Sequence, residues 1–326
     1  MRNEYAQIFL ATNDFDRARE QLDRSAKIDS QFAPTYVLLG DWDRIRGDTQ
    51  NAAANYYRAL QIDMASLTNS DGTLKEGAAS ILYQPAFIAR TIDAFRKISE
   101  ANPTAVAPHY ALGDLYKRNN QRDWARKEYD QIIRLDPKNY IAYLTLVNFL
   151  SETGQIDDAV TQVRRAYDLA VQARSTDAQR IQEFSNQLQA LQKAIQTAQK
   201  SPDDLNARRT LANAWKARGQ LELALPEFQA VARLAPNDYD APKNLVLIGA
   251  QLNRLDDAQA ALPSATALAP DNEKPIWQNI QVAINAQRTR QFDQSIKAIQ
   301  AAIALAGDAD KPALQAYLTL LQNTSK

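Results

Sequence analysis

Apolar side chains in the middle of the chain follow a helical spacing. Ile181, Phe184, Leu188, Leu191 and Ile195 alternate at intervals of three and four residues. Positions with that spacing lie on one side of an α-helix, whereas a strand would scatter them over both faces. We therefore predict one long connecting helix within residues 174–204, about 22 residues in length. Helix-start signals lie at both ends of this segment: Thr176 with Gln179, and Ser201 with Pro202.

This apolar stripe has two interpretations. It can pack against the helices that flank it in the same chain, or it can form a dimer seam or hinge through residues 176–199. The stripe is shorter than the three to four heptads typical of a coiled coil. Packing within the chain is therefore favoured, and the homodimer is kept as the alternative.

A second pattern, a repeat, runs through most of the remaining sequence. Alanine recurs in the same local context at Ala18 and Ala52, at Ala125 and Ala159, and at Ala224 and Ala258, and the members of each pair are 34 residues apart. A period of this length predicts supersecondary units that stack on one another. The surrounding positions recur as well: Tyr36, Leu39, Gly40, Gly47, Tyr56 and Ala59 in 33–66; His109, Leu112, Gly113, Tyr116, Asn120, Tyr129 and Pro137 in 106–139; Tyr143, Leu146, Gly154, Val163 and Ala166 in 140–173; Leu211, Ala212, Trp215, Gly219, Phe228 and Pro236 in 205–238; Leu245, Asn253, Leu262, Ala265 and Pro270 in 239–272.

These positions resemble the pattern of the tetratricopeptide repeat family, whose repeat is a pair of antiparallel helices. Small residues such as Gly40 and Gly113 let two helices approach closely, and large ones such as Tyr56 fill the space between neighbouring pairs. Glycine or asparagine at the turns, as at Gly47 and Asn120, accepts the left-handed conformation that ends a helix.

The resemblance implies an all-α fold, a right-handed superhelical solenoid of antiparallel helix pairs. One hairpin cannot bury its apolar face alone, so successive pairs stack. We predict an N-terminal array over 1–173, the connecting helix over 174–204, and a C-terminal array over 205–326. The expected repeats are 1–32, 33–66, a degenerate 72–105, 106–139, 140–173, 205–238, 239–272 and a degenerate 273–309, followed by a capping helix over 310–322.

Composition excludes several classes of function. Lys plus Arg and Asp plus Glu both number 38, and no basic run occurs, so a nucleic-acid partner is not expected. No apolar stretch is long enough to span a membrane, so no direct membrane insertion is expected in this chain. Cysteine is absent, which removes thiolate nucleophiles and Cys/His zinc sites.

Catalysis is not expected either. The single histidine, His109, stands at an aromatic place of its repeat, where a packed or hydrogen-bonded core residue is expected. No partner for a general base is recognisable. Acidic pairs such as Asp157–Asp158 lie at helix starts, where they complement the helix dipole. The sequence therefore predicts a non-enzyme without cofactor or metal.

The family resemblance also implies a candidate binding site. In such superhelices the first helices of the pairs line the concave groove, and some members grip an acidic C-terminal tail with a two-carboxylate clamp. The positions matching the clamp are spaced at intervals of 4, 31, 30 and 4 residues. Cationic and amide donors converging there would suit a terminal carboxylate. The clamp set is Arg209, Asn213, Asn244, Lys274 and Gln278, with Lys216 and Lys243 nearby; Gln278 stands where the family pattern has arginine.

A second candidate groove lies in the N-terminal array. Its mixed charges and single aromatic residue suit a peptide or protein partner, and they are equally typical of a solvated helix face. This set is Asp41, Arg44, Tyr110, Asp114, Lys117, Asn148 and Glu152.

The function predicted is a protein–protein interaction scaffold. One alternative is a carboxylate-clamp receptor for an acidic tail, of the chaperone-adaptor type. Another is the soluble repeat domain of a membrane-bound bacterial cell-envelope machine for polysaccharide or secretion, in the cytoplasm or outside it. The first predicted helix starts without a preceding cap, so we expect the chain to be a fragment of a longer protein.

Overall fold

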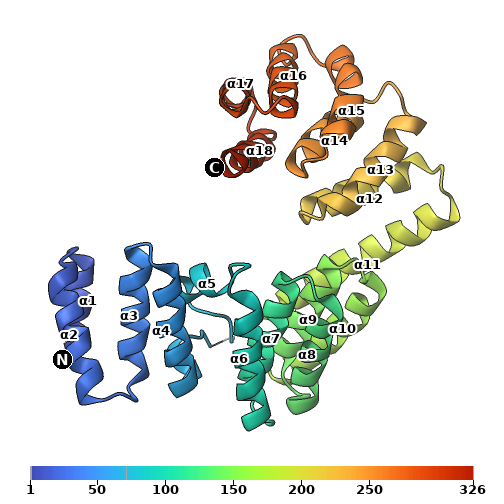
Figure 1. Cartoon of the computed structure of the whole chain (residues 1–326). Coiled ribbons are helices and arrows are strands. Elements are labelled where there is room, and N and C mark those ends of the chain that lie inside the picture. Colours follow the sequence, from blue (N-terminus) through green and yellow to red (C-terminus); the bar gives the residue numbers. More distant parts are fainter. Residues whose placement is uncertain (1, 71, 326) are drawn as a thin grey trace. The chain divides into compact units, whose positions relative to one another are not determined.

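The structure is a computed structural model that describes residues 2–70 and 72–325. Within these residues the chain forms 18 α-helices and one short 3₁₀ helix, and contains no strand (Figure 1). The nearest approach to a sheet is a single antiparallel bridge between Thr68 and Leu74. The all-α prediction is confirmed.

The described residues divide into two compact units. The N-terminal unit runs through Ser151 and includes Thr161–Gln182; the C-terminal unit contains Glu152–Val160 and everything from Glu183 onward. The N-terminal unit contains α1 (Arg2–Ala11), α2 (Phe15–Ile28), α3 (Ala33–Ile45), α4 (Thr49–Ile62), η1 (Met64–Ser66), α5 (Glu76–Leu82), α6 (Ile88–Ala101), α7 (Ala107–Arg118) and α8 (Arg122–Leu135).

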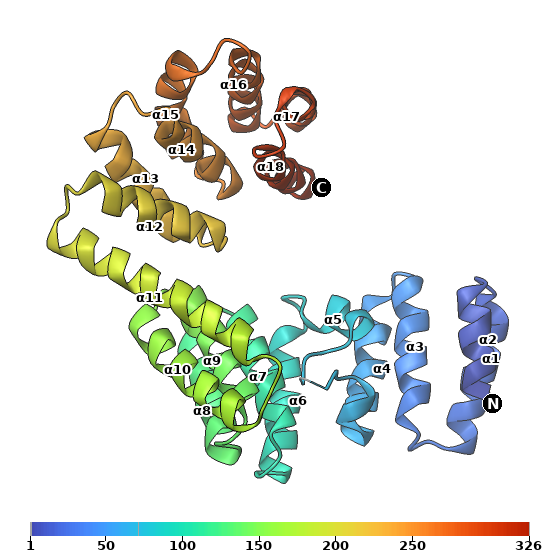
Figure 2. The same cartoon turned by 180° about the vertical axis from the view of Figure 1, so that it is seen from behind.

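The C-terminal unit contains α12 (Leu205–Ala217), α13 (Leu221–Leu234), α14 (Asp240–Gln251), α15 (Leu255–Leu268), α16 (Lys274–Arg288), α17 (Phe292–Leu305) and α18 (Lys311–Thr324). The boundary between the units falls within α9 (Tyr140–Glu152), α10 (Ile156–Gln172) and α11 (Ala178–Lys200). Figures 1 and 2 show α11 as one continuous helix. Its stripe residues Ile181, Leu188 and Leu191 are buried, as expected for packing within the chain.

Close helix packing explains the small residues of the repeat. A Cβ atom added to Gly40 on α3 would lie 2.5 Å from the ring of Tyr56 on α4, and the same clash arises between Gly113 on α7 and Tyr129 on α8. Tyr56 is completely buried. Each glycine therefore makes room for an aromatic ring of the partner helix, which confirms the predicted role of the small residues. The Tyr56 ring contacts Gly40 within its own helix pair, however, whereas the prediction had it filling the space between neighbouring pairs.

The turns between paired helices also match the prediction. Gly47, Gly154 and Gly219 adopt φ values of 81°, 78° and 70°, and Asn120 and Asn253 both adopt 56°. All five lie in the left-handed region, which glycine and asparagine tolerate best.

One insertion interrupts the N-terminal unit. Between α4 and α5 the chain forms η1 and a polar loop, in which Gly72 adopts a φ of 80°. A Cβ atom there would lie 2.6 Å from Cβ of Tyr110 on α7, so the loop backbone rests directly on that helix. On the side of the second helices, a cavity of about 680 Å³ opens between α4 and α6, with Tyr57, Leu60 and Ile98 among its lining residues.

Candidate partner-binding faces

We call the side of each unit that carries the first helices of its pairs the inner face: α3 and α7 in the N-terminal unit, and α12, α14 and α16 in the C-terminal unit. On the N-terminal inner face, Asp41 of α3 accepts a hydrogen bond of 2.7 Å from the Tyr56 hydroxyl of α4. Arg44, one turn further along α3, lies 3.4 Å from the same carboxylate oxygen. The start of α5 covers this group, since a Cβ atom on Gly77 would lie 2.6 Å from Oδ1 of Asp41.

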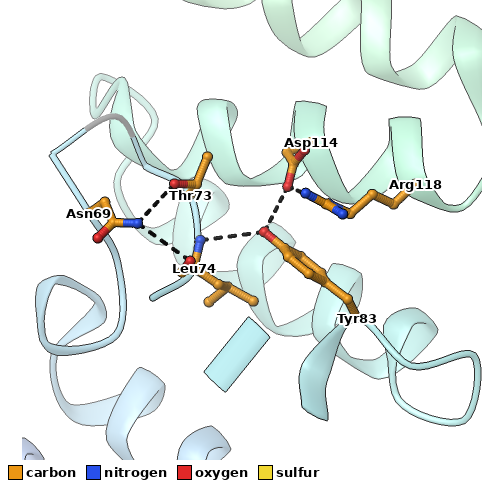
Figure 3. Close-up of polar contacts among 6 residues, drawn as sticks. All are labelled: Asn69, Thr73, Leu74, Tyr83, Asp114 and Arg118. Atoms are coloured by element: carbon orange, nitrogen blue, oxygen red, sulfur yellow. Dashed lines mark hydrogen bonds and ion pairs between the residues drawn. The ribbon is translucent and has the colours of Figure 1, made fainter. Parts of the chain in front are cut away.

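A second network of the same composition lies on α7 (Figure 3). The Tyr83 hydroxyl donates to Oδ2 of Asp114 over 2.7 Å, and Nε of Arg118 donates to that oxygen over 2.8 Å. The Arg118 guanidinium also stacks over the Tyr83 ring, 4.1 Å from its centroid. The backbone N–H of Leu74, in the inserted loop, donates to the Tyr83 hydroxyl. The inserted loop, the end of α5 and helix α7 are therefore joined through the Tyr83 hydroxyl.

These networks change the electrostatics of the N-terminal inner face. Burial raises the pKa of Tyr56 and of Tyr83 far above its usual range, and the negative charges of Asp41 and Asp114 raise it further. Both phenols therefore stay protonated as donors, and both carboxylates are neutralised by their own chain. Tyr110 and Lys117 are half-buried and also engaged within the chain, whereas Asn148 is exposed.

Sequence reasoning placed Asp41, Arg44 and Asp114 on this face, but it did not join them to Tyr56, Tyr83 or Arg118. Arg118 follows Asp114 by four residues, a spacing that could have predicted their ion pair. Tyr83 could not have been found in this way, because it follows a short helix whose position depends on the insertion.

The C-terminal inner face has the opposite charge pattern. Nζ of Lys243 on α14 lies 2.7 Å from Oδ2 of Asp310, the residue before α18, and both side chains are only 16% exposed. The Lys243 ammonium also lies 5.6 Å from the centroid of the Tyr239 ring. Tyr239 is itself fixed, since it donates to Glu273 and accepts a hydrogen bond of 2.9 Å from Trp277.

Lys216 on α12 adds a second cation to this cluster. Its side chain is exposed to solvent, yet the surrounding protein lowers its pKa by desolvation, and the charge of Lys243 lowers it too, while Asp310 and Asp240 act in the opposite direction. An ammonium group in such a position gains from an additional negative charge.

The residues at the clamp positions differ in their partners and in their exposure to solvent. Arg209 pairs with Asp238 over 2.6 Å, and Lys274 pairs with Asp271 over 2.6 Å. Asn244 is buried and donates to the backbone oxygen of Asp240, leaving its own Oδ1 without a hydrogen-bond partner among the described residues. Asn213 and Gln278 are exposed. The clamp stays a prediction. Among these lysines and arginines that pair with a carboxylate, Lys243 is the least exposed, at 16% against 44% for Arg209 and for Lys274.

His109 is part of a packed pair. Its Nδ1 lies 2.6 Å from Oε2 of Glu128, and both side chains are largely buried. Its Nε2 is buried with no hydrogen-bond partner in the described part of the chain.

Among the described residues, no helix is both long and apolar enough to cross a membrane.

Comparison with known proteins identifies the repeats. Two family models, each described as a tetratricopeptide repeat, match residues 107–139 and 128–161. The chain therefore contains tetratricopeptide repeats, and proteins built from these repeats are generally non-catalytic scaffolds for other proteins.

Two longer proteins resemble the chain in sequence. It is 27% identical over 226 residues to cellulose synthase operon protein C of Pseudomonas fluorescens (strain SBW25), covering 64% of this chain and 18% of that protein. It is 22% identical over 258 residues to anaphase-promoting complex subunit 7 of Arabidopsis thaliana, covering 77% of this chain and 39% of that protein. The chain thus spans well under half the length of either relative.

Among solved structures, the crystal structure of MamA aligns with a TM-score of 0.36 and 19% identity, covering 52% of this chain and 96% of that one.

Proposed function

We propose that this interaction scaffold holds a peptide or protein partner by a carboxylate on the inner face of its C-terminal unit. The observation that supports this proposal most is the Lys243–Asp310 pair of 2.7 Å beside the exposed Lys216. A half-buried ammonium that already binds one carboxylate has the geometry that recognition of an acidic group needs. Lys216 is the cation available to a partner from solvent.

The proposal predicts a specific dependence on acidic groups in the ligand. Fluorescence anisotropy would compare acidic peptides that end in a free carboxylate with the same peptides amidated at that end. We expect Lys216→Ala to weaken binding of the free-carboxylate peptides about fivefold, since it removes one charge-assisted contact. Lys138→Ala is the matched control, because Lys138 is an exposed lysine of the N-terminal unit. Equal affinity for free and amidated peptides, unchanged by Lys216→Ala, would contradict the proposal.

A second proposal concerns the setting in which the scaffold works. Its similarity to cellulose synthase operon protein C favours a part in a bacterial cell-envelope machine for polysaccharide. Affinity capture from a bacterium encoding this chain, with mass spectrometry, would test it. Recovery of polysaccharide-synthesis proteins is expected, and their consistent absence from a capture that retains other partners would argue against it.

Self-association through residues 176–199 is a third, weaker proposal. Leu188 and Leu191 are buried, so a dimer through them would require the stripe to leave its present packing. Light scattering that reports a monomer at all concentrations would end it.

A further inference from the structure

The last helix of the chain lies on the C-terminal inner face. Helix α18 packs against α17, and it also contacts α14, which belongs to an earlier helix pair (Figure 1). The structure therefore places a helix of the chain where the proposed function places a partner.

The contacts of α18 follow one face of the helix. Leu314, Tyr317 and Leu321 are almost completely inaccessible to solvent and belong to the same core cluster as Val246 and Leu247 of α14. The Tyr317 hydroxyl donates to Oε1 of Gln287 over 2.5 Å, and Nε2 of Gln287 in turn donates to Asn253 over 2.9 Å. The opposite face of α18 is exposed.

The acidic contact stands at the start of the same face. Asp310 precedes the first residue of α18, and its side chain makes no capping hydrogen bond to that helix. Its carboxylate instead binds Lys243. Asp310, Leu314, Tyr317 and Leu321 are spaced at intervals of four, three and four residues. An amphipathic helix that docks in a groove uses anchors with this spacing.

We infer that the C-terminal inner face is a receptor for an amphipathic helix of a partner protein, with an acidic residue at its start and apolar anchors 4, 7 and 11 residues later, and that α18 is its resident occupant. The partner helix would replace α18, bringing its own carboxylate to Lys243. This inference rests on the proposed function only in its choice of binding face.

The connection to α18 is compatible with its release. Residues 307–309 are exposed, and nothing lies within 4 Å of a Cβ atom added to Gly307. The segment therefore makes few contacts that would have to break when α18 leaves the face.

A binding experiment on the full chain tests the inference. The probe is a fluorescently labelled synthetic peptide with the sequence of residues 306–325. The released variant carries Leu314→Asp and Leu321→Asp, which place charges on the buried face of α18. The matched control carries Gln315→Asp and Thr319→Asp, which add the same charges to the exposed face of the same helix.

We expect the released variant to bind the peptide at least tenfold more tightly than the unaltered chain or the control, because a resident helix blocks the face at high effective concentration. Adding Lys243→Met to the released variant should weaken binding about fivefold, and Asp310→Asn in the peptide should have a similar effect. Lys297→Met, an exposed lysine on α17, should have none. A released variant that keeps its helical circular dichroism yet does not bind the peptide would overturn the inference.

Hydrogen exchange on the unaltered chain covers the case in which the released variant does not fold. We expect the amides of α18 to exchange through a local opening, at least tenfold faster than those of α14 and α16. Exchange of α18 only together with α14 and α16 would overturn the inference. A dimer formed by exchange of α18 between two copies would also overturn it, since the occupant would then be a second copy.

The two proposals fail separately. Acidic peptides that bind through Lys216 while α18 stays closed would refute the inference and leave the proposed function intact. Release of α18 and binding of the helical probe, without any Lys216-dependent binding of acidic peptides, would refute the proposed function and leave the inference intact.

Discussion

The two inner faces use the same kinds of charged groups in opposite ways. In the N-terminal unit, carboxylates lie on the first helices, and each is neutralised by a tyrosine and an arginine close by, as in the Asp114, Tyr83 and Arg118 network. In the C-terminal unit, cations lie on the first helices: Arg209 of α12 pairs with Asp238 within the array, whereas Lys243 of α14 takes its counter-ion from Asp310, the residue before α18. A charge neutralised within its own array belongs to the scaffold, whereas one neutralised by an appended helix can change its partner.

The largest effect is expected from the packing beneath the N-terminal face. Gly113→Val should lower the free energy of unfolding by about 3 kcal/mol, because the added side chain overlaps the Tyr129 ring. Ala212 stands at the corresponding repeat position of the C-terminal unit, after Leu211 as Gly113 stands after Leu112, and Ala212→Gly should cost only about 1 kcal/mol. Urea denaturation would measure both. Equal losses for the two variants would mean that the glycine is not specially required.

The next effect concerns the phenol of the N-terminal network. Tyr83→Phe removes the hydrogen bond to Asp114 and should lower the free energy of unfolding by about 1.5 kcal/mol. Arg118→Gln should cost less, since Arg118 is exposed. Urea denaturation would compare the free energies of unfolding of the two variants. A larger loss for Arg118→Gln than for Tyr83→Phe would show that the ion pair, and not the phenol, holds the network.

Alkaline pH should weaken the same network. The pKa of Tyr83 is raised in the folded state by burial and then by Asp114, so between the unfolded value near 10 and the folded value the unfolded chain binds fewer protons. The contribution of Tyr83 to the free energy of unfolding is therefore fully present below about pH 10. It falls as the pH rises above that value, by at most about 1.4 kcal/mol per pH unit. Urea titrations at pH 9.5 and 11 should show a shallower fall for Tyr83→Phe. An identical slope in both proteins would contradict this assignment.

A smaller effect should follow from the cation of the C-terminal face. Lys243→Met leaves Asp310 without its cation and should cost about 1 kcal/mol, chiefly by loosening α18. Lys216→Met should cost close to nothing, because the exposed Lys216 makes no comparable ion pair and its charge is disfavoured by desolvation. Hydrogen exchange resolved to residues 311–324 would separate the two variants. Faster exchange in Lys216→Met than in Lys243→Met would reverse the roles assigned to these lysines.

The smallest effect is expected from the clamp position Lys274. Its ion pair with Asp271 is on the surface, so Lys274→Ala should change the free energy of unfolding by less than about 0.5 kcal/mol. Binding of acidic peptides should change less than twofold. A loss of affinity as large as that for Lys216→Ala would instead favour the clamp predicted from the spacing.

The architecture was predictable because each determinant of the repeat is local. Gly40 must face Tyr56 across one hairpin, and Asn253 must adopt a left-handed turn, so both requirements recur at fixed positions in the sequence. The inner faces were less predictable. The intervals of the clamp place Arg209 and Asn244 on first helices, but spacing carries no information on whether a side chain meets Asp238 or becomes buried.

The contacts of residues that depart from the regular repeat could not be predicted at all. Tyr83 reaches Asp114 because an insertion shortens and shifts α5, and Asp310 reaches Lys243 because α18 folds back onto α14. Both contacts depend on departures from the 34-residue period, which periodicity cannot describe.

The cavity between α4 and α6 has a consequence for how the N-terminal unit comes apart. A stack of hairpins gains its cooperativity from the interface each makes with the next, so its weakest interface sets where a partly unfolded form divides. We expect that interface to be the one between α4 and α6, where about 680 Å³ of space opens beside the inserted loop. Mechanical or chemical denaturation would then break the unit into a piece ending with α5, which packs on α3 and α4, and a piece beginning with α6, and each piece would unfold separately.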